Sequence, residues 1–296
     1  MIDRLPTKTI RGIRIICSLS ITPLTVGYIS ARRMVFYAKR MTDRLAIKTM
    51  RAVLAKYGYT ITPLVFGYIS ARRTVGAAMR RELSVCDYVE KLWNHQGETQ
   101  RVISKLASYG AFNLENPNIL EIGTGTGRYL EKVLKKCKPA KYESYEPNYG
   151  WSKWLQSTYP IISHKADGVS LRQTYADSVD LLHAHGVFVY LPFLVVYQYF
   201  KEIFRVVKNN GFVIFDIISE DCLDQSIVEK WLRSPYRYPC FLSTKYVISL
   251  FESHGFVLLG SFRACVDAGY AKYIVFKRDK TDEHGATPDC YSGDAI

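Results

Sequence analysis

The sequence contains no run of eighteen apolar residues, the length that a membrane-spanning helix requires. The candidate stretch without charge, residues 15–31, holds five Ser or Thr, one Gly and one Pro, so we do not expect it to span a membrane. CxxC pairs and an HExxH motif are also absent, and the seven cysteines are widely spaced and odd in number. We therefore expect reduced cysteines, a cytoplasmic location and no protein-bound metal.

Acidic residues are scarce in the first part of the chain. Residues 1–81 contain 16 Lys and Arg against two Asp, a net charge of +14. Residues 82–296 contain the other 24 basic residues against 25 acidic ones, a net charge of −1. The overall charge of +13 thus belongs to the N-terminal part, and the remainder has no general attraction for polyanions.

The basic region is an internal repeat. Residues 1–40 align without gaps on residues 41–80, with 21 of 40 positions identical, and Met1 aligns with Met41. A tandem duplication is the simplest origin, because each copy begins with Met as a protein does. Two copies are too few for a solenoid. We predict a helical extension over residues 1–80, and three functions stay open for it: a solvated or oligomer-contacting appendage, attachment to an anionic membrane surface, or docking on nucleic acid.

The rest of the chain has ample material for a core, because 48% of all residues are hydrophobic and 40 are Phe, Tyr or Trp. A helical pattern over residues 88–106 is followed by short apolar runs, and the helix before Gly211 is expected to end at Asn209–Gly211. These runs predict a mostly parallel sheet covered on both faces. They read NILEIG, KYESYE, IISHKAD, VDLLHAHG, GFVIFDI, GFVLLGSF and YIVFKR.

The strongest motif is NILEIGTGTGR at residues 118–128, in which a buried strand runs into a glycine turn and then a helix. Ligands of doubly wound sheets bind at such turns, beyond the carboxyl ends of the strands. Arg128 stands where the dinucleotide motif GxGxxG requires its last glycine, and GxxxxGK[ST] is absent. The spacing therefore argues against a dinucleotide site and against a P-loop.

The ends of the next two strands carry carboxylates. Glu146 ends the second run, where it can accept hydrogen bonds from both hydroxyls of a ribose. Asp167 and Gly168 follow the third run, where the carboxylate can accept from an exocyclic amine. His183 and His185 end the fourth run.

As a set, these features resemble the class I S-adenosylmethionine-dependent methyltransferases over about residues 90–278, with a weaker likeness to methyltransferases associated with bacterial surface polysaccharides. The resemblance implies a Rossmann-like α/β fold with an antiparallel final strand and S-adenosyl-L-methionine as cofactor. It also implies a set of cofactor-binding residues: Glu121, Gly123, Thr124, Gly125 and Gly127 for the methionine portion, Glu146 for the ribose, and Asp167, Gly168 and His183 around the adenine.

Methyl transfer to a hydroxyl requires a group that accepts a proton. His185 is the first candidate base, because an imidazole titrates near neutrality and the strand end points into the expected crevice. Asp216 and Glu220 are alternatives, as the base or as the group that orients the histidine. Residues 219–241 are long enough for an insertion that covers substrate. Several aromatic residues are expected on the acceptor side: Trp151, Trp154, Tyr190, Trp231, Tyr236, Tyr238 and Phe241.

We thus predict a basic extension (1–80), a methyltransferase domain (81–278) and a frayed tail (279–296). The predicted activity is methyl transfer to a hydroxyl of a small polar acceptor, such as a sugar of a surface glycan. Two alternatives remain at this point. One is an RNA methyltransferase that uses the basic extension, and the other is a catalytically silent binding protein at a membrane surface.

Overall fold

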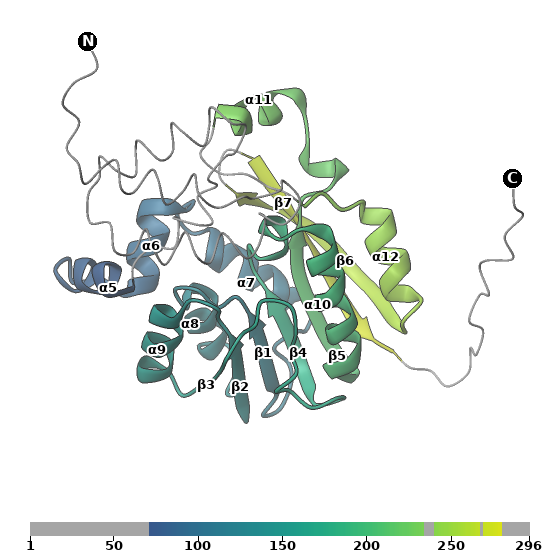
Figure 1. Cartoon of the computed structure of the whole chain (residues 1–296), viewed down its shortest axis with the longest axis horizontal. Coiled ribbons are helices and arrows are strands. Elements are labelled where there is room, and N and C mark those ends of the chain that lie inside the picture. The colour runs from purple at the N-terminus through teal and green to yellow at the C-terminus, as the bar shows by residue number, and fades with distance from the viewer. Residues whose placement is uncertain (1–70, 234–239, 267–268, 280–296) are drawn as a thin grey trace, which may run out of the picture. The chain divides into compact units, whose positions relative to one another are not determined.

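The computed structural model describes residues 71–233, 240–266 and 269–279 (Figure 1). The predictions for residues 1–70 and for the tail from residue 280 lie outside these ranges. The chain from Ile69 forms one compact unit. In its described part, no helix is both long and apolar enough to cross a membrane, and no group of three or more His, Cys, Asp or Glu could hold a metal ion.

Each of the seven apolar runs forms a strand of one sheet, whose order is β3-β2-β1-β4-β5-β7-β6. β1 to β5 are parallel, and β7 runs antiparallel to both of its neighbours, β5 and β6. This confirms the predicted Rossmann-like sheet with an antiparallel final strand. The strands are β1 (Asn118–Ile122), β2 (Lys141–Tyr145), β3 (Ile162–His164), β4 (Val179–Ala184), β5 (Val207–Ile217), β6 (Phe256–Val266) and β7 (Gly269–Arg278).

Helices lie between the strands, and local side chains set where several of them begin. Ser84 accepts a hydrogen bond from Asp87 N at 3.0 Å, and Asn148 accepts one from Trp151 N at 3.1 Å, as N-cap residues do. The helices are α5 (Ala71–Met79), α6 (Val85–Trp93), α7 (Glu98–Ser108), α8 (Arg128–Leu134), α9 (Tyr149–Thr158), α10 (Phe193–Val206), α11 (Gln225–Arg233) and α12 (Thr244–Glu252), with short 3₁₀ turns η1 (Phe188–Tyr190) and η2 (Glu220–Cys222).

Side chains alternate between the two faces of the sheet along each strand, and helices cover both faces. Leu120 of β1 belongs to the cluster that α10 and α12 cover, together with Phe200 and Phe251. Its neighbour Ile119 belongs to the cluster under α7 and α8, and the two helix layers lie on opposite sides of the sheet in Figure 1. This arrangement leaves the carboxyl ends of the parallel strands at one edge, where the predicted site residues lie.

Two predicted helices differ in the structure. The pattern over residues 88–106 forms two helices, because Gly97 adopts a left-handed φ of 80° before α7. The helix before Gly211 ends at Val206 rather than at Asn209–Gly211. The reason is that Val207 already pairs with Val179 of β4, so the following residues belong to β5.

The end of the second repeat is part of the compact unit. Ala71 and Ala78 of α5 pack in one cluster with Tyr88 of α6 and Trp151 of α9, whose side chain is 1% exposed. The unit therefore includes residues before Arg81, where the sequence analysis places the start of the domain.

Candidate active site

Three glycines with a left-handed backbone shape the turn between β1 and α8. Their φ values are 69° at Gly123, 56° at Gly125 and 75° at Gly127. A Cβ at Gly123 would lie 2.5 Å from Cγ2 of Val187, and one at Gly127 would lie 2.9 Å from Cδ2 of Leu155. A Cβ at Gly125 would meet no atom closer than 3.7 Å. Packing thus requires glycine at the two outer positions, whereas the middle one borders open space.

Glu146 connects the end of β2 to this turn. Its Oε2 accepts a hydrogen bond from Gly125 N and its Oε1 accepts one from Asn148 N, both at 2.7 Å. Burial raises the pKa of Glu146 to about 7, although the two backbone donors oppose the shift. Thr124 bonds to Ser144 of β2 through their hydroxyls at 2.8 Å. The turn is therefore fixed to β2 at two points.

Asp167 and Gly168 organise the loop after β3. The carboxylate of Asp167 accepts hydrogen bonds from Val169 N at 3.0 Å and Ser170 N at 2.8 Å, and from the Ser170 hydroxyl at 2.6 Å. These bonds, with Arg172 3.4 Å away, hold the pKa of Asp167 below its ordinary value despite partial burial. Gly168 has a left-handed φ of 85°. Asp167 thus stabilises its own loop.

A row of buried polar side chains crosses the sheet on the face that α7 and α8 cover; we call it the polar layer. Its first part joins Tyr142 of β2, Glu121 of β1 and His183 of β4. The Tyr142 hydroxyl donates to Oε2 of Glu121 at 2.7 Å and lies 3.1 Å from Nε2 of His183. Burial raises the pKa of Glu121 to about 8 and lowers that of His183 to about 3. His183 is therefore uncharged at neutral pH, and its Nδ1 lies 3.8 Å from Oε1 of Glu121.

The second part of the polar layer surrounds His185. The Tyr129 ring stacks on the imidazole with centroids 3.6 Å apart. The Tyr273 hydroxyl of β7 lies 3.1 Å from Nδ1 of His185. Nε2 is buried and has no hydrogen-bond partner in the described part of the chain. Burial, and then the neighbouring His183 and Arg128, hold the pKa of His185 well below its ordinary value.

The two predicted alternatives to His185 lie in different surroundings. Asp216 of β5 is 3% exposed and accepts a hydrogen bond from Gly186 N at 2.7 Å. Burial raises its pKa to about 6, and it belongs to the polar layer beside Tyr273. Glu220 is exposed and accepts from Thr244 N at 3.1 Å, at the first residue of α12. Its carboxylate thus caps a helix.

A cleft of about 130 Å³ opens over the glycine turn. Five of the twelve predicted site residues line it, whereas Gly127, Glu146, Asp167, Gly168, His183, Asp216 and Glu220 do not. The lining residues are Glu121, Gly123, Thr124, Gly125, Thr126, Arg128, Tyr129 and His185.

Comparison with known proteins decides the family. A family model described as a methyltransferase domain matches residues 93–260, which is more than half of the chain. The chain belongs to this methyltransferase family. No curated protein matches it.

Several solved structures are similar to this methyltransferase at low sequence identity. A chain in the complex between the Haloferax volcanii Trm112 methyltransferase activator and a methyltransferase is 13% identical, with a TM-score of 0.52; the match covers 73% of this chain and 100% of that one. Magnesium protoporphyrin IX methyltransferase from Synechocystis PCC 6803 with bound S-adenosylhomocysteine is 12% identical, with a TM-score of 0.48 and coverages of 62% and 83%. The N-methyltransferase NodS from Bradyrhizobium japonicum WM9 is 13% identical, with a TM-score of 0.46 and coverages of 62% and 89%.

The methyltransferase uses S-adenosyl-L-methionine, and the residues of the cleft fit this cofactor. The space beside Gly125 admits a ligand against the backbone, and the carboxylate of Glu146, which bonds to Gly125 N, retains lone pairs for hydroxyls. Nε2 of His185, a residue that lines the cleft, is buried and has no partner among the residues that the structure describes. The glycine turn would hold the methionine portion and Glu146 the ribose. When bound, the cofactor supplies an electrophilic methyl group on a sulfonium.

Sequence reasoning missed four residues that surround the cleft of the methyltransferase. Thr126 and Arg128 belong to the glycine motif itself, where Arg128 served only to exclude a dinucleotide site. The Arg128 guanidinium lies 4.9 Å from the centre of the Tyr129 ring. The position of this basic residue directly after the motif could have indicated that it lies at the cleft. Tyr129 and Tyr273 are 144 positions apart, and no local pattern predicts that their hydroxyls meet at 3.2 Å.

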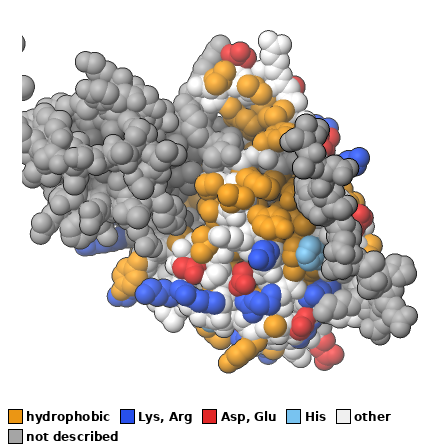
Figure 2. Space-filling view, turned by 45° about the vertical axis from the view of Figure 1, so that its right-hand side comes forward, with side chains coloured by type: hydrophobic (Ala, Val, Ile, Leu, Met, Phe, Trp, Pro, Cys, Tyr) orange, Lys and Arg blue, Asp and Glu red, His pale blue; other side chains and the backbone are white. Residues whose placement is uncertain are grey.

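The aromatic residues expected on the acceptor side are dispersed. Trp151 is buried under α5, and Tyr236 and Tyr238 lie outside the described residues. Phe241 is 52% exposed, and the exposed Phe193 ring lies 6.1 Å from that of Tyr246. Figure 2 shows hydrophobic side chains gathered over the upper part of one face, above a band of charged ones.

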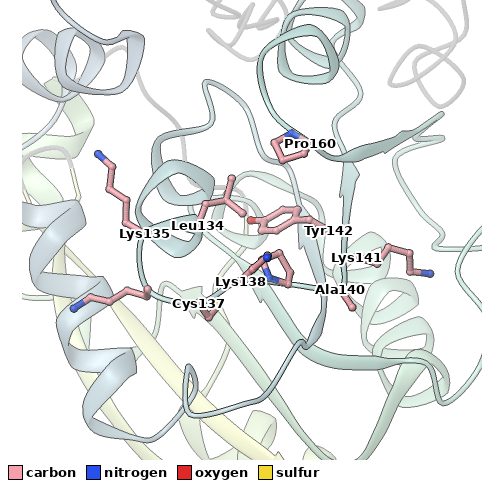
Figure 3. A pocket seen from close by; sticks show the side chains of 10 residues that line it. Leu134, Lys135, Cys137, Lys138, Ala140, Lys141, Tyr142 and Pro160 are labelled. Atoms are coloured by element: carbon pink, nitrogen blue, oxygen red, sulfur yellow. The ribbon is translucent and has the colours of Figure 1, made fainter.

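A larger cavity, of about 660 Å³, lies at the opposite end of β2 (Figure 3). Lys135 and Lys141 line it, but their side chains point away from one another. Each lysine pairs with a nearby glutamate, Lys135 with Glu131 of α8 at 2.8 Å and Lys141 with Glu143 of β2. The smaller cleft contains the predicted glycine motif, so it is the candidate active site.

Proposed function

We propose that the chain transfers the methyl group of S-adenosylmethionine to a hydroxyl of a small polar acceptor, such as a sugar of a surface glycan. The observation that carries this proposal is a buried carboxylate that can accept a proton, Asp216, in the same polar layer as His185, which lines the cleft. A hydroxyl loses its proton as the methyl group arrives, so a positioned base contributes about 10² to 10⁴ in rate.

Asp216 has the properties that this step requires. Its pKa of about 6 lies near neutrality, so the carboxylate is mostly ionised at pH 7 and still basic enough to take up a proton. Burial, which raises this pKa, also keeps bulk water from competing for the site. The hydrogen bond from Gly186 N holds one carboxylate oxygen in place.

Charge supports a small neutral acceptor over a polyanion. The sequence from residue 82 onward has a net charge of −1, so it does not concentrate nucleic acid.

The test measures release of S-adenosylhomocysteine by the purified full chain. The acceptor panel contains monosaccharides, nucleotide sugars, oligosaccharides, primary amines, carboxylic acids and RNA. We expect release with a hydroxyl-bearing acceptor and an O-methyl product by mass spectrometry. Methylation of an amine, a carboxylate or an RNA base would contradict the proposal. Binding of S-adenosylhomocysteine without turnover on any acceptor would favour a silent binding protein instead.

A further inference from the structure

The hydrogen bonds around His185 run in one line. The hydroxyl of Tyr129 lies 3.2 Å from that of Tyr273, which in turn lies 3.1 Å from Nδ1 of His185. The opposite ring nitrogen, Nε2, has no partner in the described ranges, and the imidazole lines the cleft. The ring is held between two tyrosines, with one nitrogen engaged and the other left for a ligand.

The number of available protons determines which atom donates in each of these two hydrogen bonds. Each phenol carries one hydroxyl proton, and a neutral imidazole carries one N–H. If Tyr129 donates to Tyr273 and Tyr273 donates to Nδ1, both hydroxyl protons have acceptors and the ring proton is on Nε2. If Nδ1 donates instead, Tyr273 must donate to Tyr129, whose own proton then finds no acceptor among the residues that the structure describes.

Burial makes the second arrangement costly. Tyr129 is 9% exposed and Tyr273 is 2% exposed, so water does not readily replace the missing acceptor. A buried donor without a partner loses its solvation and gains nothing in return. Within the described residues, the first arrangement leaves one group unpaired, Nε2–H, whereas the second leaves two, the hydroxyl proton of Tyr129 and the lone pair of Nε2.

The groups that face the imidazole keep it neutral, so only the two tautomers compete. His183 from β4 and Arg128 from α8 oppose a positive charge on the ring, and Tyr129 and Tyr273 are uncharged, since burial raises both phenol pKa values. Asp216 from β5 is the nearby acidic group of this layer, and it accepts a hydrogen bond from Gly186 N.

We infer that Tyr129 and Tyr273 hold His185 in the tautomer that carries its proton on Nε2. His185 then donates a hydrogen bond to an oxygen of the acceptor substrate, and proton uptake falls to Asp216. Tyr129 and Tyr273 are positioning residues that act through His185. The assignment of the tautomer is independent of the reaction, whereas the roles toward the acceptor rest on the proposed function.

Nuclear magnetic resonance of the full chain, labelled with ¹⁵N in its histidines, tests the tautomer without an acceptor. The His185→Gln variant identifies the signals of His185 among those of the six histidines. We expect an unprotonated Nδ1 and a protonated Nε2 in the wild-type chain at neutral pH. Tyr273→Phe removes the donor to Nδ1 and should convert the single tautomer into a mixture.

Tyr145→Phe is the matched control, because it removes a buried phenol hydroxyl that bonds to Thr174 at 2.9 Å, outside the polar layer. It should leave the His185 signals unchanged. A wild-type His185 with its proton on Nδ1 would overturn the inference, as would a Tyr273→Phe spectrum identical to that of the wild type. Neither result depends on which acceptor is methylated, so failure of the proposed function is detected separately.

Discussion

At the scale of single residues, Glu146 combines two functions, because one carboxylate fixes the glycine turn and would hold the ribose. Glu146→Gln keeps the size of the side chain but replaces one accepting oxygen by a donor that faces Gly125 N or Asn148 N. We expect the affinity for S-adenosylhomocysteine to fall by about 1.5 to 3 kcal/mol, the usual range for hydrogen bonds to a charged group. Isothermal titration calorimetry measures this, and unchanged affinity would remove Glu146 from the cofactor site.

The same carboxylate makes stability depend on pH. Its pKa is about 7 in the folded chain against an ordinary 4.5, so between these values the folded state keeps a proton that the unfolded state has lost. The free energy of unfolding should therefore fall as pH rises from 4.5 to 7, by about 3 kcal/mol from this group alone.

Urea unfolding at pH 5 and pH 7 checks this slope. It should be smaller in Glu146→Gln and retained in the control Glu143→Gln, because the pKa of Glu143 is lowered to about 2 by His164, Lys141 and Thr174 in spite of burial. Equal slopes in wild type and Glu146→Gln would show that Glu146 is not the group responsible.

A comparison of two variants separates the roles of His185 and Asp216. His185→Gln retains an N–H donor at the end of the side chain and should keep most of the turnover, whereas Asp216→Asn removes the proton acceptor and should lower turnover by about 10² to 10⁴. Initial rates with the identified acceptor, at saturating cofactor, measure both. The reverse order of the two effects would assign the base to His185, as the sequence alone suggested.

At the scale of elements, the glycine turn allows binding to be separated from folding. Gly125→Val places a side chain where only ligand space exists, so S-adenosylhomocysteine binding should be abolished while the chain still folds. The left-handed φ of 56° costs about 1 to 2 kcal/mol for such a residue. Gly97→Val is the matched control, with a φ of 80° and no atom within 4 Å of its Cβ. If Gly97→Val also abolishes binding in calorimetry, strain and not the blocked space explains the loss.

The elements also show what a sequence reveals and what it does not. All seven strands were predictable, because each is a short apolar run that a buried sheet requires. The glycine turn and Glu146 were predictable because they are local to strand ends. The surroundings of His185 were not, since Tyr129 and Tyr273 come from α8 and β7 and meet only when the sheet is assembled. Periodicity could not reveal the break at Gly97, which depends on a single φ angle.

At the scale of the whole molecule, the compact unit includes the end of the basic repeat. A chain that starts at Ile69 retains α5, whereas one that starts at Arg81 loses Ala71 and Ala78 and exposes Trp151. We expect the shorter chain to be less stable by on the order of 2 kcal/mol, from the apolar area that α5 covers. Urea midpoints of the two fragments check this difference. Identical midpoints would place the boundary at residue 81 after all.

The strand order has a consequence for the time at which the site becomes complete. β7 lies between β5 and β6, although β6 precedes it in the chain, so β6 has no neighbour in the sheet until β7 inserts. Tyr273 arrives with that insertion. During synthesis, a ribosome-bound chain could therefore form the glycine turn early, while its histidine still lacked the residue that orients it. Insertion of the last strand would thus complete the surroundings of His185, and an incomplete chain would be able to hold the cofactor before this histidine is oriented.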